Sequence, residues 1–403
     1  MQGRDHPTLH AFLELGFRPL YLAGAGWAAI AILIWVFSPQ LLNGVLQAVA
    51  WHGHEMLWGF IATIAVGFLM TAGANWTGLN PLPRPWLAAA CGFWVAARLL
   101  YLLPGELAFV MAGVAETVFL AGAAIAMGRA VVSSKSQRNY GVPVVLLGLG
   151  VVNLLFLWQA WLGDYTLLMR YFHVGLMLMA MLVLLVGRRV IPFFAMRAVP
   201  GLEIDKHTRS GQVQLGLSVA AIAGLLFDFT LLTAAFLALI GLVSIWQVMS
   251  WKPLAVRSRP ILWVLYLGYF VTGLGLLIAA VKVLDPGLRA AWFIHTVAMG
   301  GFSVLIIGMI TRTALGHTGR PLRLSSTMVA GYWLVVIATV FRLLALAPTV
   351  FSSGALYVSA LCWIAAFSLY VWEFFPMLVR PRPDIAPVMT KTKGIATSLR
   401  SSR

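Results

Sequence analysis

Charged residues are scarce in this chain of 403 residues: Asp, Glu, Lys and Arg together make up 10% of the sequence. A soluble domain carries about a quarter of its residues as these four types. So few charges cannot cover a water-facing surface, which excludes a soluble enzyme, a disordered chain and a fibrous protein. Hydrophobic residues make up 61% of the sequence and extend along nearly its whole length. The composition therefore predicts an all-α polytopic membrane protein.

Cysteine and acidic residues are also few. Cys91 and Cys362 both lie in apolar runs, so neither a disulfide framework nor a CxxC site is available. The 28 basic against 12 acidic residues give a formal net charge of +16. The basic residues lie in short loops rather than along one face, which indicates the anionic inner leaflet as their partner and excludes nucleic acid. The polar first 18 residues predict no cleavable signal peptide.

Twelve apolar stretches are long enough to cross a bilayer, since a hydrocarbon core of about 30 Å requires about 20 helical residues. Most are bounded by Pro, Gly or charged residues, as at Ser38-Pro39. The seventh and eighth are separated only by Asp228 and its neighbours. The predicted transmembrane helices are 19–37, 54–74, 86–103, 107–128, 142–162, 166–187, 213–228, 231–250, 261–281, 290–310, 326–346 and 355–376.

The distribution of Lys and Arg predicts the orientation of these helices. With the N-terminus in the cytoplasm, 23 of the 28 basic residues fall in cytoplasmic segments, and only Lys282 and Arg289 fall in outer loops. The remaining three lie within spans: Arg98, Arg170 and Arg342. The positive-inside rule predicts this distribution for twelve spans with both termini inside. We therefore expect one twelve-helix membrane domain over residues 1–380 and a mobile basic cytoplasmic tail over 381–403.

Four of the eight histidines lie within predicted spans or at their edges, on the second, sixth and tenth helices: His52, His54, His173 and His295. All four lie in the outer half of helices that run from outside to inside, so they share one depth. His52, His173 and His295 are separated by 121 and 122 residues, and a methionine follows each of them four residues later. This period predicts a threefold pseudo-repeat of four-helix units, at about 1–140, 141–260 and 261–380, with a shared site at their interface.

Histidines at one depth inside a membrane indicate a functional site, because an ionisable side chain in a span is costly. One imidazole can be a hydrogen-bonded core residue, but four that converge from three helices have the composition of a site for copper, iron or zinc. Glu55, next to His54, can fix a histidine tautomer or carry protons to a bound substrate. It can equally be hydrogen-bonded to a helix N-terminus.

Five motifs run from the first span to beyond the tenth: Phe17-Arg18-Pro19, Trp51-His52-Gly53-His54-Glu55-Met56, Gly67-Phe68-Leu69 with Asn75-Trp76-Thr77-Gly78, Gly187-Arg188-Arg189-Val190-Ile191-Pro192-Phe193-Phe194, and Thr311-Arg312-Thr313-Ala314-Leu315-Gly316-His317-Thr318-Gly319-Arg320-Pro321-Leu322. With these motifs the chain resembles the NnrS family, heme- and copper-containing inner-membrane proteins associated with bacterial nitric oxide metabolism. The resemblance covers nearly the whole chain. It implies heme b and copper as cofactors, nitric oxide as partner, and a location in the bacterial inner membrane.

Under this resemblance, two intramembrane arginines become candidate heme contacts. Guanidinium pairs bidentately with carboxylate, and heme carries two propionates that need partners when buried. The alternative is snorkelling to lipid phosphate, which fits Arg170 better than the other two. The predicted site therefore consists of four metal ligands, two cofactor contacts and one catalytic proton carrier: His52, His54, His173 and His295; Arg98 and Arg342; and Glu55.

A looser likeness is to the heme-copper oxidases, which include the respiratory nitric oxide reductases, and it lies in the layout of twelve helices in a threefold ring. That family uses six histidines, with pairs on the seventh and tenth helices. Here the seventh predicted helix has none and the tenth has one. Four imidazoles suffice for a heme with one axial ligand and a three-histidine copper, or for a bis-histidine heme with a weaker copper site.

The leading hypothesis is an enzyme that reduces NO to N2O for NO detoxification. Protons would enter by Glu55 or Glu116, and electrons would come from quinol or a separate carrier because the chain has no heme c motif (CxxCH). The alternatives are a non-catalytic NO sensor or buffer and a carrier of heme or copper. The cytoplasmic motifs with Arg188, Arg312 and His317 either bind a second cofactor or a quinone head group on the inner side, or anchor the protein at the inner leaflet. Formation of a homodimer stays open.

Overall fold

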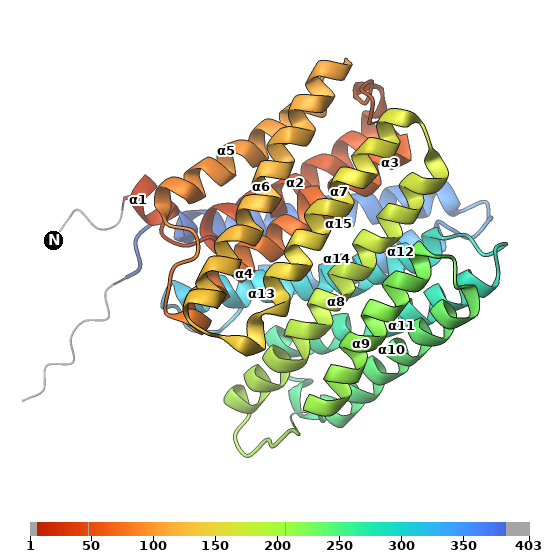
Figure 1. Cartoon of the computed structure of the whole chain (residues 1–403). Coiled ribbons are helices and arrows are strands. Elements are labelled where there is room, and N and C mark those ends of the chain that lie inside the picture. The colour runs from red at the N-terminus through yellow and green to blue at the C-terminus, as the bar shows by residue number, and fades with distance from the viewer. Residues whose placement is uncertain (1–5, 47, 206, 384–403) are drawn as a thin grey trace, which may run out of the picture.

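The computed structural model of the chain describes residues 6–46, 48–205 and 207–383, and the regular elements in these ranges are all helical (Figure 1). The predicted basic tail lies, from residue 384 onward, outside the described residues. The elements are α1 (Leu9–Phe12), α2 (Phe17–Phe37), η1 (Pro39–Leu41), α3 (Ala48–His54), η2 (Glu55–Ala62), α4 (Thr63–Thr77), α5 (Arg84–Leu100), α6 (Glu106–Ser133), η3 (Gln137–Asn139), α7 (Gly141–Leu162), α8 (Tyr165–Ala198), α9 (Thr208–Leu226), α10 (Thr230–Ser250), η4 (Pro253–Val256), α11 (Pro260–Leu284), α12 (Ala291–His295), η5 (Thr296–Ser303), α13 (Val304–His317), α14 (Ser326–Leu344) and α15 (Ser352–Leu378).

Each of the twelve predicted spans overlaps one long helix, and α3–η2–α4 and α12–η5–α13 are each continuous. Among the described helices, ten are long and apolar enough to cross a membrane. The other two are α5, with 17 residues, and α9, whose first turns are polar. The chain is thus a multi-pass helical membrane protein, and the count of twelve spans with both termini inside stays a prediction.

The helix ends follow the breaks that the sequence predicts. Gly78 ends α4 and Gly163 ends α7, both with a φ near 72° that a residue with a Cβ adopts only with strain. The Asp164 carboxylate accepts a hydrogen bond from Leu167 N and caps α8. Asp228, also with positive φ, lies between α9 and α10. The two closely spaced stretches around Asp228 are therefore separate helices.

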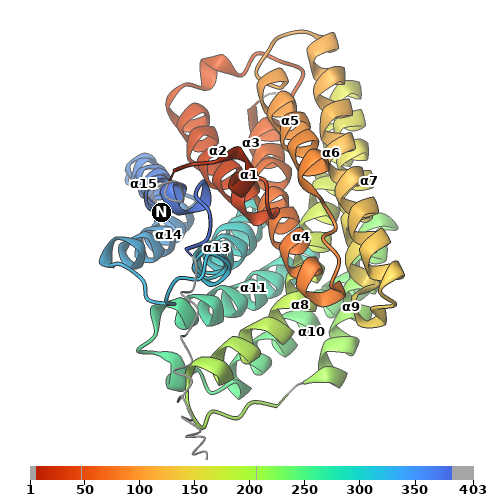
Figure 2. The same cartoon turned by 90° about the vertical axis from the view of Figure 1, so that its left-hand side faces the viewer.

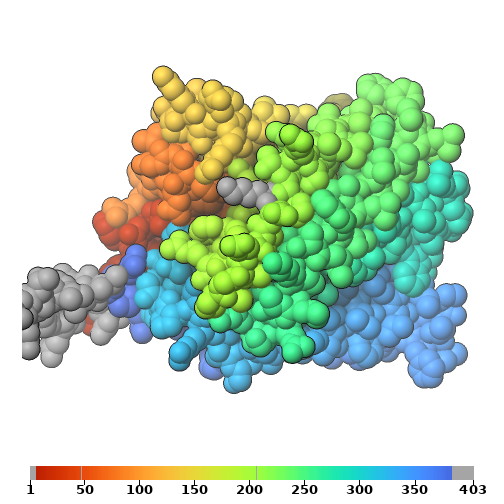
Figure 3. All heavy atoms as spheres, turned by 90° about the horizontal axis from the view of Figure 1, so that it is seen from below, coloured from red at the N-terminus to blue at the C-terminus, as the bar shows by residue number. Residues whose placement is uncertain are grey.

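Helices that follow one another along the chain pack side by side, and the last helix, α15, packs against the first long one, α2. Figures 1 and 2 show one bundle of helices with neighbouring axes running alongside one another. In Figure 3, seen from below, the green atoms of the α9 and α10 region lie between the yellow region of α6 and α7 and the blue C-terminal helices.

The helices that carry the predicted histidines form the core of the bundle. Segments η2, α8 and η5 contact one another. In the most apolar stretch of Ala48–Thr77, 83% of residues are buried, and in that of Ala291–His317 72% are buried, against 33% in Ser326–Leu344. The centre of the bundle is therefore built from the three helices that bear His52, His173 and His295. The threefold repeat itself stays a prediction.

Two of these core helices change to the wider π-helical winding at corresponding places. Segment η2 begins directly after His54, and η5 begins directly after His295. Thr63 donates a hydrogen bond to Trp58 O and Ser303 donates one to Ala298 O, in both cases to the carbonyl five residues back. π-Helical turns occur frequently at functional sites, because they shift the direction in which the following side chains point.

Candidate functional site

A cavity of about 340 Å3 lies next to the imidazoles of His52 and His295. It is bounded by α2, the α3–η2 region, α8, α12–η5, α14 and α15, and its walls are mostly apolar. The histidine, methionine and arginine side chains in its lining are His52, His295, Met56, Met169, Met299, Arg289 and Arg342. Among the described residues no Asp or Glu lines it.

The imidazoles of His52 and His295 lie as far apart as two imidazoles that share one metal. Their planes are nearly parallel, at 19°, and their ring centres are 6.4 Å apart. Two metal–nitrogen bonds of about 2.0–2.1 Å, together with the distances from nitrogen to ring centre, give roughly 6.3 Å between centres. Nδ1 of His295 lies 2.8 Å from Ala291 O. A carbonyl only accepts, so Nδ1 carries the hydrogen and Nε2 keeps a free lone pair for a metal.

His52 is oriented less firmly than His295. Its ring lies parallel to Trp35, at 5.1 Å between centres and 8° between planes. Its Nδ1 is buried and has no hydrogen-bond partner among the described residues. A metal-binding histidine is normally fixed by a hydrogen bond from its other ring nitrogen. Of the two imidazoles, that of His52 is therefore the easier one to displace.

Arg342 and Arg289 bring positive charge to this otherwise apolar cavity. Arg289 donates a hydrogen bond from Nη1 to Leu346 O over 3.0 Å, and Arg342 makes no ion pair with a described carboxylate. A partly buried guanidinium favours a carboxylate or phosphate partner, and here that partner must come from outside the described chain. Arg342 lines the cavity, and its role as a cofactor contact stays a prediction.

The cavity fits a heme in the chemistry of its lining. Apolar walls suit the macrocycle, the two imidazoles suit the axial positions of an iron, and the two guanidiniums suit propionates. For copper the fit is weaker, because no group of three or more His, Cys, Asp and Glu in the described part of the chain could hold a metal ion. The cavity also has the thioethers of Met56, Met169 and Met299, which are soft ligands suited to Cu(I).

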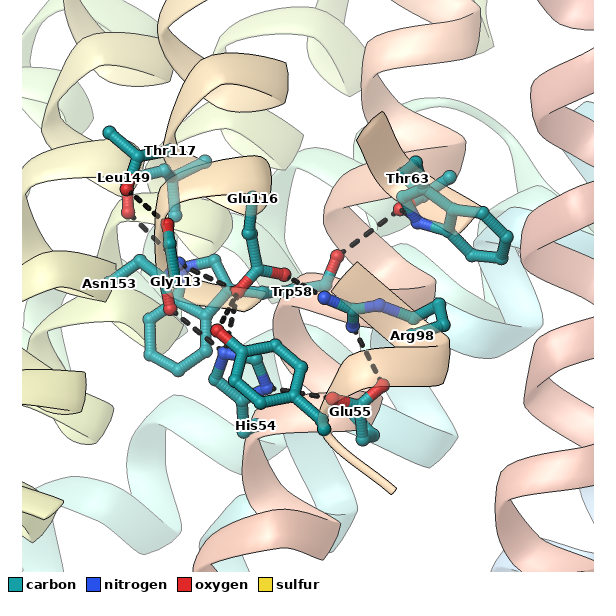
Figure 4. A network of polar contacts seen from close by, with 12 residues as sticks. His54, Glu55, Trp58, Thr63, Arg98, Gly113, Glu116, Thr117, Leu149 and Asn153 are labelled. Carbon is teal, nitrogen blue, oxygen red and sulfur yellow. Dashed lines mark hydrogen bonds and ion pairs between the residues drawn. The ribbon is translucent and has the colours of Figure 1, made fainter. Parts of the chain in front are cut away.

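His54 belongs to a different, fully buried site, which Figure 4 shows. Its Nδ1 lies 2.9 Å from Glu55 Oε1, and its Nε2 lies 2.8 Å from Glu116 Oε2. Arg98 forms ion pairs with both carboxylates, at 2.7 Å to Glu55 Oε2. Glu55, Arg98 and Glu116 come from η2, α5 and α6, so the network joins three helices. We call these four residues the buried charge network.

Hydrogen bonds from neutral side chains complete this network. Trp27 Nε1 donates to Glu55 Oε2 over 2.6 Å, Tyr101 donates to Glu116 Oε2 over 3.1 Å, and Asn153 Nδ2 donates to the same oxygen over 3.0 Å. His54, Glu55, Arg98 and Glu116 are each at most 2% exposed. Buried charges are stable only when they are paired and hydrogen-bonded in this way.

The charges of the network balance when His54 is protonated. Ionised carboxylates only accept hydrogen bonds, so an imidazole between two of them donates from both nitrogens and is an imidazolium. The positive charges of His54 and Arg98 then equal the negative charges of Glu55 and Glu116. Loss of one proton would leave a net negative charge at a site without water contact. The network therefore holds one proton.

These contacts differ from the sequence-based prediction at two residues. Both ring nitrogens of His54 face carboxylates, so His54 has no lone pair left for a metal. Arg98 is paired with Glu55 and Glu116 rather than placed at the cavity for a propionate. The side chain of Phe156, which packs on His54 and also lines the cavity, lies between the two sites. We accordingly assign His54 and Arg98 to the buried charge network.

His173 and Arg170 lie apart from both sites. His173 packs against Phe293 at 5.1 Å between ring centres, and its Nε2 is buried without a hydrogen-bond partner among the described residues. It does not line the cavity at His52. Arg170 forms an ion pair of 2.8 Å with the exposed Asp228. The structure therefore brings together two of the four predicted histidine ligands.

Gly59 leaves room for the buried charge network. A Cβ at this position would lie against Nη1 of Arg98 and 2.7 Å from Oε2 of Glu55. We expect Gly59→Ala to lower the free energy of unfolding by about 1–3 kcal/mol, the usual cost of overpacking a core. The midpoint of thermal unfolding of the purified protein measures the effect. Gly92→Ala on α5, where a Cβ meets nothing within 4 Å, is the control, and equal midpoints for both variants would contradict the assignment.

A protein-family model matches nearly the whole chain. The model of the NnrS protein family matches residues 11–382. A search of curated proteins finds no match. The matched range includes the cavity at His52 and His295 as well as the buried charge network.

Proposed function

Because the chain belongs to the NnrS protein family, which the match over nearly its whole length shows, we propose that it reduces nitric oxide to nitrous oxide with heme b and copper. The family consists of membrane proteins linked to nitric oxide metabolism that bind heme and copper. The observation that carries the proposal is the pair His52 and His295 at an apolar cavity, with the thioethers of Met56 and Met299 alongside. An apolar cavity suits NO, which is small and uncharged.

The proposed reaction converts two NO molecules, two electrons and two protons into one N2O and one water. A bound heme and copper supply the electron transfer and polarise the substrate. Electrons come from quinol or from a separate carrier. The chain's own residues have three tasks: they hold the cofactor, exclude water and deliver protons.

The apolar walls of the cavity exclude water, and the other two tasks fall to identifiable polar residues. His295, whose Nδ1 is held by Ala291 O, and the less firmly held His52 would bind the iron of the cofactor. Arg342 and Arg289 bind the anionic groups of the cofactor. The buried charge network delivers protons, with Glu55 as the carboxylate that the sequence predicts for this role.

A second candidate function is a non-catalytic NO sensor or buffer. The observation that favours it is the same histidine pair, because two axial imidazoles leave no open position on an iron until one of them moves. A sensor needs no proton delivery, however, and the buried charge network is then only structural. The role of Glu55 therefore distinguishes the two functions.

The membrane context of this activity is also a proposal. We place the protein in the bacterial inner membrane with both termini in the cytoplasm, because of the excess of Lys and Arg in the segments that are then cytoplasmic. Membrane lipid surrounds the bundle, and a homodimer is compatible with the lipid-facing surface.

The test is an anaerobic assay of purified, cofactor-loaded protein with excess reductant and NO. We expect N2O over many turnovers, at one N2O for two NO. Glu55→Gln should slow turnover about 100-fold, the size of a lost proton-transfer group, while heme and copper contents stay unchanged. Glu106→Gln, at the exposed start of α6, is the control. Stoichiometric NO binding without N2O would contradict the enzyme and favour the sensor or buffer.

A further inference from the structure

A second, smaller cavity lies beside the cofactor cavity, in the core of the bundle. Its volume is about 100 Å3, and it is lined by residues of α2, η2, α4, α8, η5 and α13. Its lining consists of aliphatic, aromatic and methionine side chains, and Tyr21 carries the only hydroxyl among the described residues there. We call it the inner chamber, and representative lining residues are Ile61, Ile64, Leu69, Met179, Phe302 and Met309.

The chemistry of this lining excludes water and ions as occupants. A water needs two to four polar partners, whereas an apolar cavity of this kind stays dry and can take up xenon or a small hydrocarbon. A volume of about 100 Å3 admits an atom or a molecule of a few atoms and is too small for a porphyrin. The chamber thus selects small uncharged gases by size and polarity.

The inner chamber adjoins the cofactor cavity. Ile61 lines both. On the opposite helix, Phe302 lines the chamber and its neighbour Ser303 lines the cofactor cavity. Both contacts fall in the π-helical segments η2 and η5, so the wall between the two spaces is formed where these helices depart from regular α-helix.

We propose that the inner chamber is a binding site for a small apolar gas and that this gas reaches the cofactor cavity past Ile61. The identification of the gas as NO rests on the proposed function, whereas the binding of a gas does not. A gas molecule held in the inner chamber lies next to the cofactor cavity. It can replace a gas molecule that has reacted in the cofactor cavity. For a reaction that needs two NO molecules, this storage raises the local supply of the second one.

Xenon tests the binding site without any cofactor chemistry. In crystals under xenon pressure, anomalous diffraction should show one xenon between Ile64, Met179 and Phe302. Ala65→Leu, which adds a side chain inside the chamber, should abolish this peak, and Val183→Leu is a milder variant with the same expected effect. Ala88→Leu on the exposed face of α5 is the matched control and should retain the xenon. A chamber without xenon in the unchanged protein, or one filled by a lipid chain, would overturn the proposal.

Rebinding of NO after flash photolysis of the reduced, NO-loaded protein tests the route. We expect the fast rebinding phase from inside the protein to lose at least half of its amplitude in Ala65→Leu and to be unchanged in Ala88→Leu. This measurement follows binding and not turnover, so an inactive protein that binds NO still gives an answer. The route past Ile61 would be overturned if the fast rebinding phase had the same amplitude in both variants although Ala65→Leu no longer binds xenon.

Discussion

Purified His295→Ala protein is expected to contain at least about tenfold less heme than the unchanged protein. The reason is that Nε2 of His295 is the only firmly oriented metal-binding nitrogen at the cavity, since Nδ1 is fixed by Ala291 O. His52→Ala should keep most of its heme, because His295 still binds the iron. Its absorption spectrum should change from that of a low-spin, six-coordinate heme to that of a high-spin, five-coordinate one. Pyridine hemochrome analysis and optical spectra measure both effects.

One further histidine variant serves as the control for this experiment, and a second one tests a copper ligand. His10→Ala, at an exposed position, should leave heme and copper unchanged. His173→Ala reports on copper, because its buried Nε2 lacks a partner in the described chain and the sequence predicts this residue as a ligand. Full heme in both His295→Ala and His52→Ala would contradict the proposed cofactor position.

The second large effect is a loss of stability in Arg98→Leu. We expect no such loss in Arg342→Leu, so the two variants distinguish the roles of these arginines. Arg98→Leu leaves Glu55 and Glu116 with one positive partner, and breaking a buried ion pair by removing one member costs about 3–5 kcal/mol. This variant should unfold at a much lower temperature or fail to accumulate in the membrane. Arg342→Leu should fold normally, because Arg342 has no carboxylate partner in the described chain, and should instead bind heme more weakly.

A double variant tests the charge balance directly. Arg98→Leu combined with Glu116→Gln removes one charge of each sign, so that Glu55 and His54 still balance. We expect this double variant to recover at least about 1–2 kcal/mol of the stability lost in Arg98→Leu, the usual size of coupling between contacting charged residues. Equal stability of Arg98→Leu and Arg342→Leu, or no recovery in the double variant, would contradict the buried charge network.

Much of the helical architecture could be predicted from the sequence, because hydrophobic length is a strong constraint in a membrane. The breaks at Gly78, Gly163 and Asp228 lie where sequence punctuation indicates them. The largest difference is at α8, which continues beyond the predicted end at 187 to Ala198. The end of an apolar stretch marks the point where a helix leaves the membrane core. It does not mark the end of the helix, because the polar turns that follow can stay helical in water.

The histidine site could be predicted only in part. The shared depth of His52 and His295 predicts that they meet, and the structure places them together. His52 and His54, however, are two residues apart in one helix, so their side chains point about 200° apart around the axis and cannot face the same cavity. Applied to the sequence, this rule shows that His54 cannot bind the same metal as His52. It does not find the new partners of His54, because Glu116 and Asn153 come from other helices.

The π-helical segments could not be predicted from hydrophobicity. A single wide turn changes which residues face the core without changing the composition of the helix. After His54 and His295 this change places Gly59 beside the buried charge network and Ile61 and Ser303 at the cavities. The details of both sites therefore depend on backbone geometry that periodicity alone does not show.

The most direct test of the cofactor position is a cryo-electron microscopy map of the heme-loaded protein. The account predicts heme density between the imidazoles of His52 and His295, with its carboxylates directed to Arg342 and Arg289 and no metal at His54. Heme at His54, or beside His173 with the space between His52 and His295 empty, would contradict it.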